Sequence, residues 1–224
     1  MRQLKNTRMK LLILSILCIM LRAFAVTKLS ADLVGGGKPN IIRATLGDHV
    51  YDIPSNYGSY STSGMDAPKV GYGEFTFEVL LPDFEPRTAA NSPQLDVVGW
   101  HDQVRGVIEA FSKSYKLDDN KAALSRFLAQ PWYSGVVPIT INGYRIYTPR
   151  LKPQPDLRTK SLPDGDVLVM LCVQNWGPVV FPSCTVYEHW QGLRMTLNFS
   201  RNYAEQAENI DRKVKTMMLS FREK

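Results

Sequence analysis

The chain has 224 residues and a formal net charge of +6, and this positive charge is concentrated at the N-terminus. Residues 1–25 hold five of the 27 Lys and Arg residues and none of the 21 Asp and Glu residues, so the other 199 residues carry 22 basic groups against 21 acidic ones. Nucleic-acid binding needs clustered positive charge, so this balance argues against a nucleic-acid partner. A remainder of this length suits one domain with a substantial core.

The N-terminus has the pattern of an export signal. A basic segment precedes the apolar run "LLILSILCIML", and "AFA" at residues 23–25 fits a small-x-small cleavage motif. Eleven apolar residues are too few to span a bilayer, which needs about 20. We therefore predict cleavage between Ala25 and Val26 and a periplasmic mature chain with no stable membrane span. The alternatives are a retained N-terminal anchor and lipidation at Cys18, for which the preceding Leu17 is a poor fit.

Next along the chain, we expect a flexible linker over residues 26–40 and a single domain over 41–224. The run "IIRATLGDHVYDIP" predicts a β-hairpin that turns at Gly47-Asp48. Residues 55–73, rich in Ser, Gly and Tyr, predict a long loop. "EFTFEVLL" alternates apolar and polar residues, which is typical of a half-buried strand.

The middle of the chain contains one ambiguous segment. Residues 95–115 fit either a helix or a strand, and we predict a strand over residues 103–111 because Gly99 and Gly106 weaken a helix. A short helix is expected from Asp118 to Leu128, ahead of Pro131. "ITINGYRIY" predicts a hairpin around Asn142-Gly143, and residues 149–165 predict a polar, proline-rich loop.

The C-terminal part predicts strands followed by a helix. "DVLVMLCVQ" has the composition of a buried strand, and "CTVYEHW" and "LRMTLNF" predict a strand pair that turns at Gln191-Gly192. From Asn202 onward the apolar residues recur every three or four positions, which predicts a long amphipathic helix, and Asn202 with Glu205 resembles a capping box. The expected fold class is α+β, with antiparallel strands and segregated helices.

Two cysteines, Cys172 and Cys184, follow the predicted signal peptide. In an exported protein an even number of cysteines predicts a disulfide; the alternative is two buried free thiols. The loop between them is apolar and holds Trp176, Val179 and Phe181. These side chains either contact a partner or cap the core, and the sequence leaves both possibilities open.

The stretch "LPDFEPRT", residues 81–88, sets Asp83, Glu85 and Arg87 between and beside two prolines. We predict a structural corner in which Phe84 turns inward and Glu85 or Arg87 is presented to a partner. The alternative is catalytic: Asp83, Glu85 and Glu188 would be the acid and base groups of an envelope hydrolase.

Motifs for catalysis or metal binding are absent from the sequence. It contains no H-E-x-x-H, no C-x-x-C and no G-x-S-x-G, and each of its three histidines, His49, His101 and His189, stands alone. We therefore expect no metal, no cofactor and no enzymatic activity.

Several stretches together resemble a group of small exported proteins of Gram-negative bacteria that are associated with type VI secretion effectors, including lipases. They are "VYDIPSNY", "LLPDFEPRT", the loop from Cys172 to Cys184, and the C-terminal run that begins "GLRMTLNFSRNY". The resemblance implies a periplasmic immunity protein that binds and blocks a toxic effector protein. A structural or ligand-carrying envelope protein is a third possibility.

Overall fold

The computed structural model describes residues 39–61, 73–97, 99–111, 119–150, 153–173 and 181–223. The predicted signal peptide, its cleavage position between Ala25 and Val26, and nearly all of the predicted linker lie outside these residues. Within the described ranges, no helix is long and apolar enough to cross a membrane.

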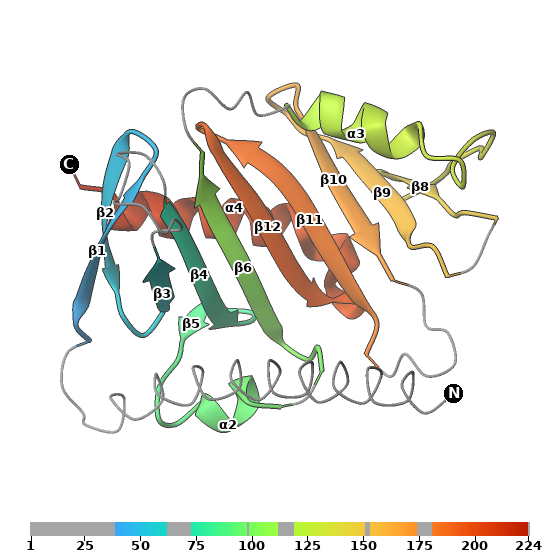
Figure 1. Cartoon of the computed structure of the whole chain (residues 1–224). Coiled ribbons are helices and arrows are strands. Elements are labelled where there is room, and N and C mark those ends of the chain that lie inside the picture. The colour runs from blue at the N-terminus through green and yellow to red at the C-terminus, as the bar shows by residue number, and fades with distance from the viewer. Residues whose placement is uncertain are drawn as a thin grey trace, which may run out of the picture. The chain divides into compact units, whose positions relative to one another are not determined.

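A strongly twisted ten-stranded antiparallel sheet forms the centre of the domain (Figure 1). Its strands run in the spatial order β3-β4-β6-β12-β11-β10-β9-β8-β7, and β5 pairs with β4. The bounds are β3 Gly58–Ser61, β4 Gly73–Leu80, β5 Glu85–Pro86, β6 Gln103–Ala110, β7 Ile139–Ile141, β8 Tyr144–Tyr147, β9 Asp156–Ser161, β10 Val167–Cys172, β11 Ser183–Trp190 and β12 Leu193–Ser200.

The remaining elements are a separate hairpin and the helices. Strands β1 and β2 form the two-stranded hairpin, and a 3-10 helix, η1, leads into the last helix. Their bounds are β1 Ile41–Leu46, β2 His49–Pro54, α2 Ser92–Leu95, α3 Asn120–Leu128, η1 Arg201–Gln206 and α4 Ala207–Phe221. The predicted α+β class is confirmed.

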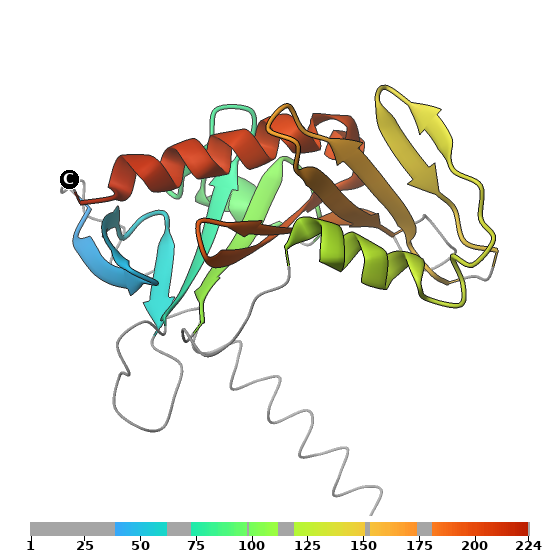
Figure 2. The same ribbon diagram turned by 90° about the horizontal axis from the view of Figure 1, so that it is seen from above.

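The long helix α4 covers one face of the sheet and builds the main core (Figure 2). Its apolar stripe of Ile210, Val214 and Met218 is almost fully buried. Opposite it lie alternate residues of the central strands, such as Phe77 and Leu197. Helix α3 packs on the other face, where Leu124 and Phe127 join a second apolar cluster over β8, β9 and β10.

All three predicted hairpins are confirmed. Gly47-Asp48 joins β1 to β2, Asn142-Gly143 joins β7 to β8, and Gln191-Gly192 joins β11 to β12. In the second and third turns both central residues have positive φ, as a type I′ turn requires.

The strand predicted over residues 103–111 and the short helix predicted before Pro131 are also confirmed. The segment around residue 107 is strand β6, and the short helix is α3. Asp119 begins α3 as its N-cap, because its carboxylate accepts a hydrogen bond of 2.7 Å from the Ala122 N–H.

Two loop predictions were wrong in part. Residues 58–61 of the predicted loop 55–73 form strand β3, and residues 156–161 of the predicted loop 149–165 form strand β9. Strand β9 looks polar in sequence, yet Asp156 is buried and forms a 2.6 Å ion pair with Arg201. Arg201, which neutralises the buried carboxylate of Asp156, is 45 positions away, so the local sequence pattern cannot predict that this aspartate is buried.

The predicted capping box was also wrong. Residues 201–206 form η1, and the Ser200 hydroxyl accepts a hydrogen bond from the Asn202 N–H. Glu205 does not reach back to cap the helix, because its carboxylate accepts a 2.8 Å bond from the Asn142 amide in the β7–β8 turn.

Candidate partner-binding face

The face of the sheet opposite α4 carries polar side chains in three rows across four neighbouring strands. Alternation along β4, β6, β12 and β11 sends one set of residues to the α4 core and the other set to this side. We call this set the polar face: Glu74, Glu109, Arg194 and His189; Thr76, Val107, Thr196 and Tyr187; Glu78, Arg105, Asn198 and Thr185. All are half-buried except Thr76, which is exposed.

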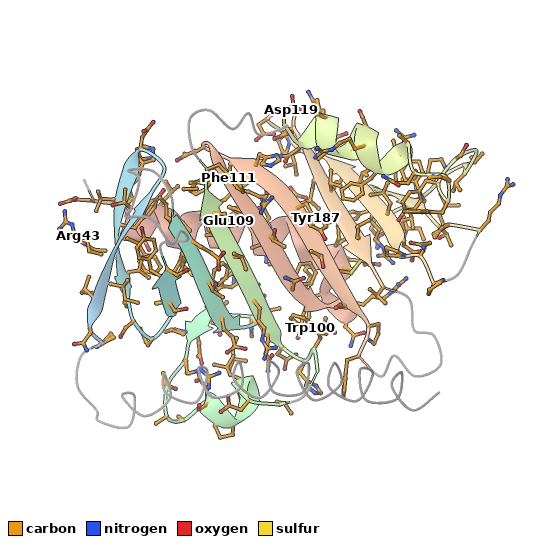
Figure 3. The ribbon with its side chains drawn as sticks, in the orientation of Figure 1. Arg43, Trp100, Glu109, Phe111, Asp119 and Tyr187 are labelled. Atoms are coloured by element: carbon orange, nitrogen blue, oxygen red, sulfur yellow. A yellow bond between two sulfur atoms is a disulfide. The ribbon has the colours of Figure 1, made fainter. Side chains whose placement is uncertain are left out.

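Helices lie along two borders of the polar face. Helix α3 lies at its β11 side, where the Phe127 ring packs 5.7 Å from the ring of Tyr187. Helix α2 lies at the end of β4 and β6, where the Leu95 carbonyl accepts a 3.3 Å hydrogen bond from Arg105. Figure 3 shows Glu109 and Tyr187 on this part of the sheet, with Phe111 and Trp100 at opposite ends of it.

Paired charges form the two outer rows. Arg194 donates two hydrogen bonds, of 2.8 and 2.7 Å, to the carboxylate of Glu109. Arg105 donates a 2.6 Å bond to Glu78. An aromatic ring also lies against each guanidinium, since Phe111 is 4.6 Å from that of Arg194 and Trp100 is 5.4 Å from that of Arg105. Both arginine side chains are therefore held in place while about 40% exposed, at 40% and 43%.

The middle row, by contrast, contains no charged group. Thr76, Val107 and Thr196 are neighbours in register, and Tyr187 ends the row on β11. A less polar centre with a charged rim is the arrangement that protein–protein interfaces prefer. Tyr187 lies at the α3 border of this row, where the ring of Phe127 packs on it.

The corner at residues 81–88 has the structural role expected from the sequence, because its Arg87 binds Glu78 of the polar face. Phe84 turns inward and is 8% exposed. Arg87 binds Glu78 at 2.7 Å and Asp96 at 2.8 Å. Burial lowers the pKa of the Arg87 guanidinium, but the hydrogen bonds to these two carboxylates outweigh burial and leave that pKa raised. Arg87 thus fixes Glu78, which in turn fixes Arg105.

The predicted partner-binding residues fall in different places. Trp176 and Val179 lie outside the described residues. Phe181 is half-buried, with its ring centre 5.8 Å from that of His101. Glu85 is exposed on β5, whereas Arg87 is occupied by its two carboxylate partners.

The predicted disulfide between Cys172 and Cys184 is present. The two cysteines face each other across β10 and β11, with a Cα–Cα separation of 4.0 Å. The next pair along the ladder is bonded through the Val173 N–H and the Ser183 carbonyl. The cysteines therefore occupy a non-hydrogen-bonded position, where the backbones approach most closely.

The three carboxylates of the hydrolase alternative do not meet in one cavity of the described residues. A groove of about 450 Å³ between α4 and the corner is lined by Asp83 together with Phe84, Arg212 and Lys213, and neither Glu85 nor Glu188 lines it. Glu188 is instead buried beneath α4, where it contacts Lys215. The described residues also contain no group of three or more His, Cys, Asp or Glu side chains able to hold a metal ion.

Sequence reasoning missed the residues of the polar face. Their signal was the polar half of each alternating strand, such as Thr76 and Glu78 in "GEFTFEVL". Which polar residues share a row depends on the register between strands that are distant in sequence, and alternation alone does not contain that register.

Comparisons with known proteins show a shared fold. No protein-family model and no curated protein sequence matches this chain. Two solved structures do match. An immunity protein of the type IV secretion system of Stenotrophomonas maltophilia aligns with a TM-score of 0.57 and 15% sequence identity, over 86% of this chain and 98% of that chain. The iron-regulated outer membrane lipoprotein FrpD of Neisseria meningitidis aligns with a TM-score of 0.51 and 13% identity, over 84% of this chain and 96% of that chain.

Proposed function

We propose that this protein is an immunity-type protein of the periplasm, which binds a toxic effector protein and neutralises it. The observation that carries the proposal is that its fold matches a secretion-system immunity protein over nearly the whole length of both chains. The second structural match, an outer membrane lipoprotein, also belongs to the bacterial envelope. The disulfide in the strand ladder suits an oxidising compartment such as the periplasm.

The polar face is the surface we assign to the effector. Its ion pairs and ring-stacked arginines are already formed in the free protein, so little side-chain freedom is lost when a partner docks on them. Four strands about 4.8 Å apart and three rows about 6.8 Å apart span roughly 14 Å by 14 Å. A standard interface buries about 800 Å² on each partner, so this area supplies only its centre.

Neighbouring segments complete the interface in this proposal. Phe181, at the end of the disulfide-closed loop, packs against His101, near Trp100 at the rim of the polar face. Trp176 and Val179 belong to the same loop and are proposed as further contacts. Exposed Glu85 is a candidate contact at the corner, whereas we assign Arg87 the supporting role that its ion pairs indicate.

The proposal extends to the class of the effector. The sequence resemblance described above favours a type VI effector, and a lipase in particular. Neutralisation would follow from physical occlusion of the effector's active site, with no chemical step by this protein. No arrangement among the described carboxylates favours a hydrolase as a second candidate.

Co-expression tests the proposed function. The products of the genes adjacent to that of this protein are directed one at a time to the periplasm with and without this protein, and survival is measured. We expect survival only when this protein is present, together with a complex of the two proteins on gel filtration. Continued killing without a detectable complex would contradict the proposal.

The disulfide-closed loop can be tested in the same assay. If Trp176 contacts the effector, Trp176→Ala weakens the complex and leaves the melting temperature unchanged. If Trp176 instead caps the core, the same change lowers the melting temperature of the free protein by several degrees.

A further inference from the structure

Strand β7 forms one outer edge of the large sheet and carries exposed apolar side chains. Ile139 is 58% exposed and Ile141 is 44% exposed, and Val137, just before the strand, is 85% exposed. Seven large hydrophobic residues are exposed among the described residues, and three of them fall within these five positions. Figure 2 shows the β7–β8 hairpin, in yellow, at the end of the sheet opposite β1 and β2.

The backbone of this edge also has hydrogen-bonding groups that β8 cannot reach. A two-residue turn joins β7 to β8, so the closing pair Ile141 and Tyr144 exchanges both backbone hydrogen bonds. Pairs alternate along an antiparallel ladder, so Thr140 occupies a position that is not bonded to β8. Its N–H and C=O therefore point outward from the sheet edge.

The opposite edge of the sheet is different. Ser59 and Ser61 of strand β3 are polar. The β1 strand lies against it, and the Tyr60 hydroxyl donates a 3.0 Å hydrogen bond to the Thr45 carbonyl. Natural proteins protect free edges with lysine, proline, bulges or covering segments. Strand β7 has three residues and Pro138 directly precedes it, so a second strand can pair only along Ile139–Ile141, where both isoleucines are exposed.

We propose that β7 is a self-association site, where it pairs antiparallel with β7 of a second copy of this chain. The sequence Ile-Thr-Ile reads the same in both directions, so a two-fold axis through Thr140 places each isoleucine opposite an isoleucine of the second copy. The central pair is then threonine on threonine, whose outward N–H and C=O groups bond each other. A two-fold interface needs such a self-complementary patch, and β-branched side chains pair well across strands.

The charge near this edge permits the pairing and makes its strength depend on salt concentration. Arg145 on β8 is exposed beside Thr140, with its guanidinium over the ring of Tyr147. Three strand spacings of about 4.8 Å separate Arg145 from its equivalent in the second copy, or roughly 14 Å. That distance exceeds the Debye length of about 8 Å at physiological salt but not the 30 Å at 0.01 M. The pairing should therefore weaken at low salt. With only three residues paired per copy, we expect a dissociation constant on the order of 0.1 mM.

Sedimentation velocity of the mature, oxidised protein alone tests the inference, and its outcome is independent of the proposed function. From 5 to 500 µM in 0.3 M salt, the average mass should rise from monomer toward dimer, and the rise should be smaller in 0.01 M salt. Ile139→Lys and Thr140→Pro should remain monomeric; the proline removes the outward N–H, which does not bond to β8, together with the threonine side chain. Leu219→Lys, which changes an exposed apolar residue of α4, is the matched control and should associate like the wild type. Circular dichroism verifies that each variant is folded.

Two results would overturn the proposal. The first is a wild-type protein that stays monomeric up to 500 µM at 0.3 M salt. The second is an Ile139→Lys variant that associates as strongly as the wild type. If the wild type is monomeric but Ile139→Lys loses binding to the effector, the edge belongs to the effector interface and not to self-association.

Discussion

At the scale of single residues, the most unusual feature is a group of three ionisable side chains beneath α4. Glu188 on β11 and Asp211 on α4 are each 3% exposed, and Lys215 binds both carboxylates. Burial raises the pKa of Glu188 to about 9, and hydrogen bonding and repulsion from Asp211 add to the rise, which Lys215 opposes. The raised pKa favours the protonated form of Glu188 at neutral pH, and a neutral carboxyl group costs less to bury than a carboxylate.

This protonation makes stability depend on pH. The pKa of Glu188 in the folded state exceeds its ordinary value of 4.5, so between pH 4.5 and about 9 the folded state binds more protons than the unfolded state. The stabilisation is full below pH 4.5 and is lost as pH rises toward 9, with a slope of at most about 1.4 kcal/mol per pH unit. Urea unfolding at several pH values measures this slope. Glu188→Gln should flatten it and make the protein more stable at pH 8; an unchanged slope would refute the assignment.

A second prediction at this scale concerns Gly99, which lies under Phe181. Its φ is +109°, and a Cβ at this position would lie 2.4 Å from Cγ of Phe181. Gly99→Ala should destabilise the protein by about 2–4 kcal/mol, from overpacking and backbone strain together. Gly165→Ala is the control, because Gly165 has φ +84° with no atom within 4 Å of the added Cβ. It should cost only about 1 kcal/mol, and equal losses in the two variants would show that contact with Phe181 is unimportant.

At the scale of elements, the parts that sequence predicts well are those whose cause is local. The three hairpins follow from two-residue turns such as Asn142-Gly143, and helix α4 follows from its apolar stripe. Strand β9 and the start of α4 depend on distant partners. Arg201 compensates buried Asp156, and Asn142 occupies the carboxylate of Glu205. Such tertiary contacts override a local pattern, so those two predictions failed for the same physical reason.

The disulfide also belongs to this scale, because it closes the loop between β10 and β11. Replacing both Cys172 and Cys184 with serine should lower the free energy of unfolding by about 3 kcal/mol, chiefly by freeing the unfolded chain. Both serines would also lie in a fully buried position, which adds to the loss. Thermal unfolding of the oxidised wild type, the reduced wild type and the double variant measures these contributions. A double variant that unfolds at the temperature of the oxidised wild type would contradict this expectation.

At the scale of the whole molecule, the two faces of the sheet differ in what lies against them. One face is covered by α4 and forms the core (Figure 2), while the other carries three rows of polar side chains bordered by α2 and α3. Sequence alternation identified β4 as a half-buried strand, with one polar side. It did not place Glu109 beside Arg194, because these residues are 85 positions apart and meet only through the β6–β12 register.

Binding of the effector to a variant of the polar face tests the central claim most directly. Thr76 is the exposed member of the middle row, and Thr216 is an exposed threonine on α4, which covers the opposite face. Isothermal titration with the effector identified by co-expression should give at least a tenfold weaker affinity for Thr76→Arg, about 1.4 kcal/mol. The affinity of Thr216→Arg should stay within twofold of the wild type. Wild-type affinity in the Thr76→Arg variant, or an equal loss in both variants, would contradict the assignment of the effector to the polar face.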